Sequence, residues 1–251
     1  LQTLRIIMFL ENKYLKFKGL NLTIETLDGL LKHNGPFEDH SKLDALVGVK
    51  NLKGKIKFSN YPSLEAQIAA MADDIAYNNH DIQDGIQAKL FTLKDLIEID
   101  FFKEIFKFHK KNLKGKNQEI LIYQIIRDSI DLMVKDLINN TIKNKKFFKI
   151  KNLKDVYKSP KTLASFSENF NIIDKEIRFF LKSKMYNNSQ VLTKNNKGKK
   201  IIKSLFNLIS KKPYKFLAKR KFTKKEKFRV IADFISGMTD RYAINLYNSA
   251  K

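Results

Sequence analysis

The sequence has no cysteine and no tryptophan among its 251 residues. Without cysteine, the chain forms no disulfide bond, offers no thiolate nucleophile and binds no metal through sulfur. Its uninterrupted apolar runs are also short, such as the run from Ile6 to Leu10. A membrane-spanning helix needs about 18 or more consecutive apolar residues. The sequence therefore predicts no transmembrane helix and no membrane partner.

Sequence motifs of several enzyme classes are absent as well. The chain contains no GxGxxG, GxxxxGK[ST], GxSxG or HExxH pattern. Dinucleotide-binding, P-loop, esterase-type and zincin chemistry therefore have no support from motifs. The segment FISGMTDRYA (residues 234–243) places a serine before a glycine, but it has no histidine base nearby.

The chain does contain enough apolar material for a core. Hydrophobic residues make up 43% of it, and a chain of this length buries a substantial core as one large domain or two small ones. A disordered polycation is therefore excluded. The first residue, Leu1, already belongs to an amphipathic pattern, and no signal peptide is visible. We therefore expect the chain to begin inside a longer protein.

Positive charge is concentrated in the C-terminal part. The chain carries 49 Lys and Arg against 26 Asp and Glu, a net charge of +23. Residues 1–100 have a net charge of −2, and residues 101–251 have a net charge of +25. Almost all the excess is lysine, which rises with asparagine and isoleucine as in an AT-biased coding sequence, whereas phosphate-gripping surfaces usually enrich arginine. A solvated, compositionally drifted surface is favoured, and a polyanion site in this part is the alternative.

Helical periodicity dominates the chain, and the fold class that it predicts is all-α. Thr23 and Ser63 are the expected N-caps of two helices, and Pro213 marks the turn before the last one. Val47–Phe58 is either a short hairpin or a loop. The predicted helices span Leu1–Phe17, Thr23–His33, Ser63 to His80 or beyond, Leu93–His109, Gln118–Asn144 and approximately residues 161–184, 189–210 and 224–248.

The helix that begins at Ser63 carries the residues with the most chemistry. At about 100° per residue, one face collects Ala70, Asp73, Tyr77, His80, Asp81 and Asp84. The opposite face collects Ile68, Ala72, Ile75, Ile82 and Ile86. The polar face is either a solvated acidic surface or a ligand site. The second interpretation gains support because this lysine-rich chain has no lysine from Ser63 to Ala88, and because small Ala66 and Ala70 allow close approach.

Carboxylates together with histidine bind divalent cations, and Tyr77 and Asp81 would line up along a ligand bound there. The other histidines, His33, His40 and His109, have no second His-Asp pair at metal spacing. His33 ends its helix in KHNGP, where a histidine is more often a partner of the helix dipole than a ligand. A complete metal site therefore cannot be built from these residues alone.

Two long segments resemble one enzyme family. EAQIAAMADDIAYNNHDIQDGI (65–86) and GLNLTIETLDGLLKHNGP (19–36) are similar to consecutive elements of the HD-domain deoxynucleoside triphosphate triphosphohydrolases, the dGTPase-like proteins. LQTLRIIMFLENKY (1–14) is similar to the segment after the EHN element of that family. Four further segments resemble the C-terminal phosphohydrolase-associated region of that family, in the same order: SFSENF, LKSKMYNNSQV, KGKKIIKSLFNLI and DFISGMTDRYA.

The resemblance implies two helical domains and a partial active site. Residues 1–112 would be the C-terminal part of the HD domain, and residues 113–251 the phosphohydrolase-associated domain. Such enzymes hold a divalent metal through an H…HD…D set, and Asp73 matches its last Asp. Tyr77 and Asp81 match positions near the substrate sugar and phosphates, and Asp74 has no assigned role. The first His, the HD pair and the catalytic His/Glu element lie upstream in the family, so no catalytic residue is expected in this chain.

The implied reaction is hydrolysis of a dNTP, dGTP-like, to the deoxynucleoside and inorganic triphosphate with Mg²⁺ or Mn²⁺. We expect the chain alone to be inactive, and the whole protein to be cytoplasmic and a homo-oligomer. Arg178 and Arg241 are candidates for the cations that offset the charge of the substrate. The alternatives are a basic helical module that binds single-stranded nucleic acid and a purely structural helical partner.

Overall fold

The computed structural model describes residues 2–36, 55–110, 118–217 and 222–249. Within these ranges the chain is helical and contains no strand, which confirms the predicted all-α class. None of the described helices is both long enough and apolar enough to cross a membrane. The chain divides into two compact units, Leu1–Leu181 and Lys182–Lys251.

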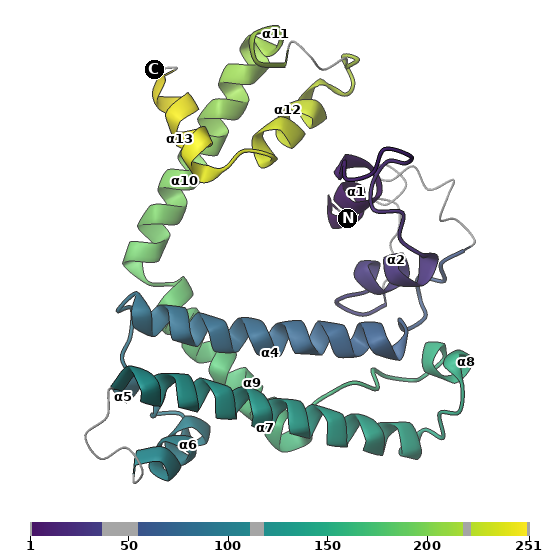
Figure 1. The fold of residues 1–251 in the computed structure, drawn as a ribbon, viewed down its shortest axis with the longest axis vertical. Helices are drawn as coiled ribbons and strands as arrows, with labels where there is room; N and C mark the ends of the chain where they lie inside the picture. The colour runs from purple at the N-terminus through teal and green to yellow at the C-terminus, as the bar shows by residue number, and fades with distance from the viewer. Residues whose placement is uncertain (1, 37–54, 111–117, 218–221, 250–251) are drawn as a thin grey trace. The chain divides into compact units, whose positions relative to one another are not determined.

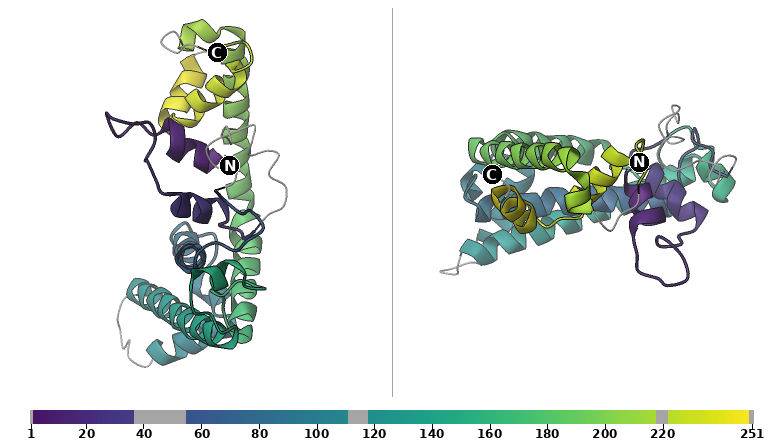
Figure 2. Two further views of the ribbon diagram at one scale, coloured as in Figure 1. Left: turned by 90° about the vertical axis from the view of Figure 1, so that its right-hand side faces the viewer. Right: turned by 90° about the horizontal axis from the view of Figure 1, so that it is seen from above.

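The first unit is organised around two long helices, α4 and α7. Helix α4 packs along α7, α6 packs on α7, and α2 and α9 both contact α4. Helix α2 lies on one side of α4 and α7 on the other (Figures 1 and 2). The described helices of this first unit are α1 Gln2–Arg5, the π-helix η1 Ile6–Leu10, α2 Ile24–Leu31, α4 Leu64–Gln87, α5 Leu93–Leu96, α6 Asp100–Lys110, α7 Gln118–Phe147, α8 Leu153–Tyr157 and α9 Glu168–Leu181.

The second unit is a small bundle around α10, which packs against α12 and α13. Its core includes Leu205, Ile209 and Ile231, each of which is 0% exposed. Pro213 is the first residue of α11, where its missing N–H costs no helical hydrogen bond. The helices are the π-helix η3 Lys182–Tyr186, α10 Ser189–Lys211, α11 Pro213–Leu217, α12 Lys227–Ser236 and α13 Asp240–Ser249.

The boundary predicted between the two domains, 112/113, falls within residues 111–117, outside the described ranges. The boundary between the two compact units lies at another place in the sequence, between Leu181 and Lys182. The domain assignment stays a prediction.

Helix α4 begins as the sequence predicts. Ser63 is the N-cap, and its Oγ accepts a hydrogen bond from the backbone N–H of Ala66 at 3.3 Å. Glu65 lies in the first turn, where a negative charge favours the helix dipole. The helix then continues without a break to Gln87.

The buried face of α4 differs in part from the prediction. Ile75 and Ile82 are buried as expected, at 2% and 0% exposure, but Ile68 is 40% exposed and Ala72 is exposed too. Their places are taken by Gln67, Asn78, Asn79 and Gly85. The side-chain NH2 groups of Gln67, Asn78 and Asn79 each donate a hydrogen bond, which offsets their burial, whereas the buried Oδ1 of Asn79 has no partner among the residues that the structure describes. The Phe91 ring packs directly on Gly85, and a Cβ there would lie 2.2 Å from it, so this position requires glycine.

Gln67 shows how such a buried amide is satisfied. Its Nε2 donates to the carbonyl of Pro62 at 2.9 Å. Its Oε1 accepts the backbone N–H groups of Leu163 at 2.8 Å and Ala164 at 3.2 Å. From α7, the Nδ2 of Asn144 donates to the carbonyl of Leu163 at 2.9 Å. These amides hold the segment before α9 against both long helices, so α9 enters the unit in a fixed place.

Several predicted helices are shorter than expected. Leu1–Phe17 is wrong as one helix, because the helical run ends at Leu10 and the chain folds back through Gly19. The N–H of Leu20 then donates to the carbonyl of Ile7 at 2.7 Å. Gly19 has φ +68° and a Cβ there would meet the Met8 carbonyl oxygen at 2.3 Å, so only glycine fits.

The other corrections are breaks within predicted helices. The helix predicted over 93–109 is interrupted between α5 and α6, and the one predicted over 224–248 is interrupted at Gly237. Helix α9 begins only at Glu168. Part of Val47–Phe58 and all of His40 lie outside the described residues, and residues 55–58 form no strand.

Candidate functional site

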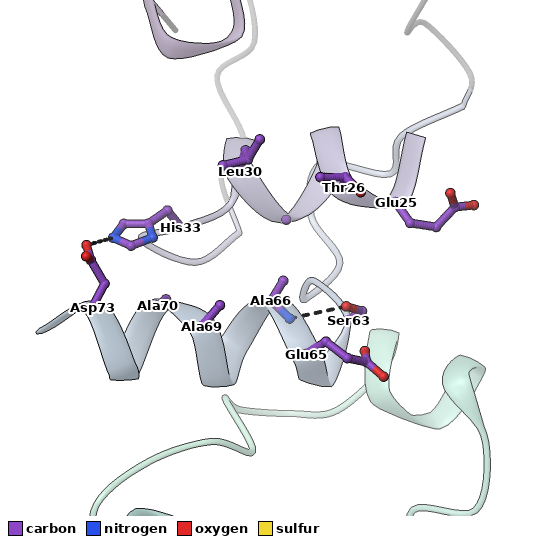
Figure 3. A pocket seen from close by; sticks show the side chains of 11 residues that line it. Glu25, Thr26, Leu30, His33, Ser63, Glu65, Ala66, Ala69, Ala70 and Asp73 are labelled. Carbon is purple, nitrogen blue, oxygen red and sulfur yellow. Dashed lines mark hydrogen bonds and ion pairs between the residues drawn. The ribbon is translucent and has the colours of Figure 1, made fainter. Parts of the chain in front are cut away.

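A pocket of about 670 Å³ opens between α2 and α4 (Figure 3). His33 and Asp73 lie at one end of it, and Glu25 and Glu65 at the other. Its lining consists of Glu25, Thr26, Gly29, Leu30, His33, Ser63, Glu65, Ala66, Ala69, Ala70 and Asp73. The exposed polar face predicted for α4 therefore opens onto a cavity at its N-terminal half.

Small residues set the distance between the two helices. A Cβ on Gly29 of α2 would lie 2.6 Å from the Cβ of Ala66 on α4, closer than two carbon atoms can pack. Ala69 and Ala70 lie on the side of α4 that faces α2 (Figure 3). The sequence predicted that small residues at 66 and 70 admit a bulky neighbour, and at Ala66 that neighbour is α2 itself.

Helix α2 is held in place at both ends. At its start, Thr23 Oγ1 accepts the backbone N–H of Thr26 at 3.3 Å, which confirms the predicted N-cap. At its end, the buried Lys32 ammonium lies 2.6 Å from Asp28 and donates to the carbonyl of Lys57 at 3.0 Å. Burial raises the pKa of the Asp28 carboxyl, although the hydrogen bond and charge of Lys32 act in the opposite direction. This internal pair fixes the backbone that carries the next residue, His33.

His33 and Asp73 meet at the mouth of the pocket. The Nε2 of His33 lies 3.9 Å from the Oδ2 of Asp73, and the two side chains are 44% and 74% exposed. At 3.9 Å the contact is electrostatic and not a hydrogen bond. Sequence reasoning treated His33 as a partner of the helix dipole and missed this neighbour. The Gly35-Pro36 stop located the end of α2, but no sequence signal gives the distance between α2 and α4.

Tyr77 and Asp81 do not line this pocket. They follow Asp73 along α4 by about 6 and 12 Å at 1.5 Å per residue. Tyr77 is 58% exposed, His80 and Asp84 are exposed, and Asp81 is partly exposed. The predicted site residues therefore form a row along one helix, with Asp73 at the pocket and the other two beyond it.

A complete metal centre is not assembled by the residues that the structure describes. In these residues no group of three or more His, Asp or Glu side chains is arranged to hold a metal ion. Asp73 and His33 supply at most two donors at one place. The described part of the chain fits a contribution of one carboxylate to a divalent metal, and does not fit the whole site.

The pocket lining is acidic. It includes the carboxylates of Glu25, Glu65 and Asp73 and no lysine or arginine. An anionic substrate would therefore need cations from elsewhere. Of the predicted cations, Arg178 is bonded to the carboxylates of Asp174 and Asp74, at 2.7 and 3.0 Å.

Comparison with known proteins covers nearly the whole chain. The family model described as phosphohydrolase-associated domain matches residues 164–249. A deoxyguanosinetriphosphate triphosphohydrolase-like protein of Pelagibacter ubique is 66% identical over 98% of this chain and 66% of its own length. Proteins of the same description from Leptospira interrogans and Bartonella quintana are 38% and 36% identical, over 64% of their lengths. The chain thus spans just under two thirds of these relatives.

The close approach of α2 to α4 gives a test of the pocket. We expect Gly29→Ala to lower the free energy of unfolding by about 1 to 2 kcal/mol, because overpacking against Ala66 outweighs the gain in helix propensity. Gly198→Ala is the control, since a Cβ there meets nothing within 4 Å and should stabilise its helix by about 0.5 to 1 kcal/mol. Urea unfolding followed by circular dichroism measures both. Equal stabilisation by the two substitutions would show that the helices are not in contact.

Proposed function

We propose that the whole protein hydrolyses a deoxynucleoside triphosphate, because this chain belongs to the family of deoxyguanosinetriphosphate triphosphohydrolase-like proteins. The proposed products are the deoxynucleoside and inorganic triphosphate, and dGTP or a similar nucleotide is the proposed substrate. The proposal includes a cytoplasmic location and a homo-oligomer, both of which rest on the resemblance alone.

Asp73 is the proposed metal ligand in this chain. One observation carries the assignment: its carboxylate is 74% exposed at the mouth of a pocket and lies beside a histidine. Carboxylate oxygens are preferred ligands of Mg²⁺ and Mn²⁺, and a bound metal would polarise a phosphoryl oxygen. In this proposal the other ligands come from a part of the protein beyond the described residues.

Tyr77 and Asp81 are the proposed substrate-binding residues. The Tyr77 phenol both donates and accepts hydrogen bonds, and the Asp81 carboxylate accepts them from hydroxyl groups. Because they lie one and two turns beyond Asp73 on the same exposed side of α4, they can contact the parts of a nucleotide next to the metal-bound phosphate. The rigid helix fixes their spacing before the substrate binds.

Substitution of Asp73 tests the proposal. We expect the 251-residue chain alone to release no triphosphate from dGTP in the presence of Mn²⁺. Completed with the part of the Pelagibacter relative that lies outside the match, it should be active. Asp73→Asn should then lower the rate at least about 100-fold, since loss of a hydrogen-bond partner of a metal ligand already costs about 10- to 100-fold and loss of the ligand itself should cost more.

The control for this substitution is Asp100→Asn, which changes a carboxylate that is 87% exposed on α6. Its rate should equal that of the parent. An Asp73→Asn variant as active as the parent would refute the assignment of Asp73. Metal-dependent release by the chain alone would refute the expectation that its site is incomplete.

A second candidate function concerns the unit Lys182–Lys251. Residues 182–251 carry 19 Lys and Arg against 3 Asp and Glu. Tyr214 is 75% exposed and stacks on Phe222, with ring centroids 5.8 Å apart and planes inclined by 18°. Exposed aromatic rings among lysines are typical of surfaces that bind single-stranded nucleic acid.

Tyr214 provides the test of this second function. If the unit binds single strands by stacking, Tyr214→Ala should weaken the binding of a fluorescent oligothymidine about 5- to 100-fold. Tyr242→Ala is the control, because Tyr242 is 51% exposed and is not part of the Tyr214–Phe222 stack. Affinity should also fall steeply with salt. Equal affinities of the parent and Tyr214→Ala would leave only charge attraction and exclude a stacking site.

A further inference from the structure

Two consecutive aspartates of α4 face two different helices. Asp73 lies beside His33 at the end of α2, at 3.9 Å. Asp74 accepts a hydrogen bond from the Nη2 of Arg178 on α9 at 3.0 Å. Neighbouring residues of a helix point about 100° apart, so the direction of Asp74 determines the direction of Asp73.

Three hydrogen bonds link four side chains in a row between α4 and α9. The Nε of Arg178 donates to Asp174 Oδ2 at 2.7 Å, one turn earlier on α9. Asp174 Oδ1 in turn accepts from the Nδ2 of Asn78 at 3.1 Å, one turn after Asp74 on α4. Asn78 is 4% exposed. The set therefore holds α4 at the residues that directly follow the two candidates: Asp74 after Asp73, and Asn78 after Tyr77.

The guanidinium of Arg178 is suited to this arrangement. Partial burial alone would lower the pKa of Arg178, but the hydrogen bonds and charges of Asp174 and Asp74 raise it above its ordinary value. The group therefore stays charged, and its planar fork reaches two carboxylates at once, which an ammonium group cannot reproduce. Since both carboxylates occupy it, Arg178 serves the site through Asp74.

We propose that Asp74 and Arg178 are positioning residues: within the small range of rotation that buried Ile75 and Ile82 allow, their contact sets the direction of Asp73 and Tyr77 on α4. The proposal rests on the proposed function of Asp73. Helix α9 lies within the region matched by the phosphohydrolase-associated model. That region consequently contributes to the site by orienting the helix that carries the candidate ligand.

Removal of Arg178 should leave the fold intact. The Arg178 and Asp74 side chains are 47% and 42% exposed, and exposed ion pairs contribute little to stability. Ile75 and Ile82 are 2% and 0% exposed and anchor α4 independently of Arg178, so we expect the helix to stay packed in every variant. A change at Asp73 would therefore reflect its orientation and not unfolding.

The test is a double-mutant cycle read at His33 by ¹⁵N NMR of its imidazole ring. In the parent chain, Asp73→Asn removes the neighbouring carboxylate and should shift the ring signal. In an Arg178→Gln background the same substitution should have less than about half that effect, because Asp73 no longer faces His33. Arg178→Lys is the second variant if Arg178→Gln does not fold, and the same reduction is expected.

Lys135→Gln is the matched control, because it also removes an exposed i,i+4 ion pair, with Asp131 at 2.7 Å on α7. In the Lys135→Gln background, Asp73→Asn should shift the His33 ring signal as much as it does in the parent chain. An equal effect of Asp73→Asn with and without Arg178, including no effect in either, would overturn the proposal. Since this readout needs no hydrolysis, an inactive completed protein would contradict the proposed function and leave the positioning role standing.

Discussion

Helix α4 is buried along one stripe by α7 and α9 and exposed along another, and the position of each candidate side chain follows from this asymmetry. Ile75 and Ile82 are almost fully buried, so a large rotation of α4 would expose them. Asp73 and Tyr77 consequently remain on the exposed side, and the contact of Asp74 with Arg178 adjusts their direction within it. The small residues Gly29 and Ala66 then bring α2 close enough to turn part of that side into a pocket.

Local features of this arrangement could be predicted from the sequence. Thr23 and Ser63 cap their helices through hydrogen bonds to residues three positions later. Such short-range signals can be recognised within a single short segment of the sequence. The exposed polar face of α4 follows from helical geometry. The burial of Gln67 and Asn78 could not be predicted, because each has a partner 96 positions away: Leu163 for Gln67 and Asp174 for Asn78. The approach of His33 to Asp73 likewise depends on how two helices pack.

Charge separates the chain into parts with different chemistry. The pocket between α2 and α4 presents Glu25, Glu65 and Asp73 and no lysine or arginine, so it suits a metal ion better than a bare phosphate. Arg178, which the sequence offered as a cation for the substrate, is bonded to two aspartates. The lysine excess of residues 182–251 belongs to the other compact unit. In our proposal the chain, which spans 66% of the Pelagibacter relative, supplies one metal ligand and the rest of the protein supplies the others.

The most direct test of this account is the affinity for Mn²⁺, measured by electron paramagnetic resonance. The chain alone should bind Mn²⁺ with a Kd of about 1 mM or weaker, because few ligand oxygens converge in it. Completion with the unmatched part of the Pelagibacter relative should tighten binding at least about 100-fold, and Asp73→Asn should abolish that gain. Tight binding by the completed protein that survives Asp73→Asn would contradict the central claim that Asp73 of α4 is a metal ligand.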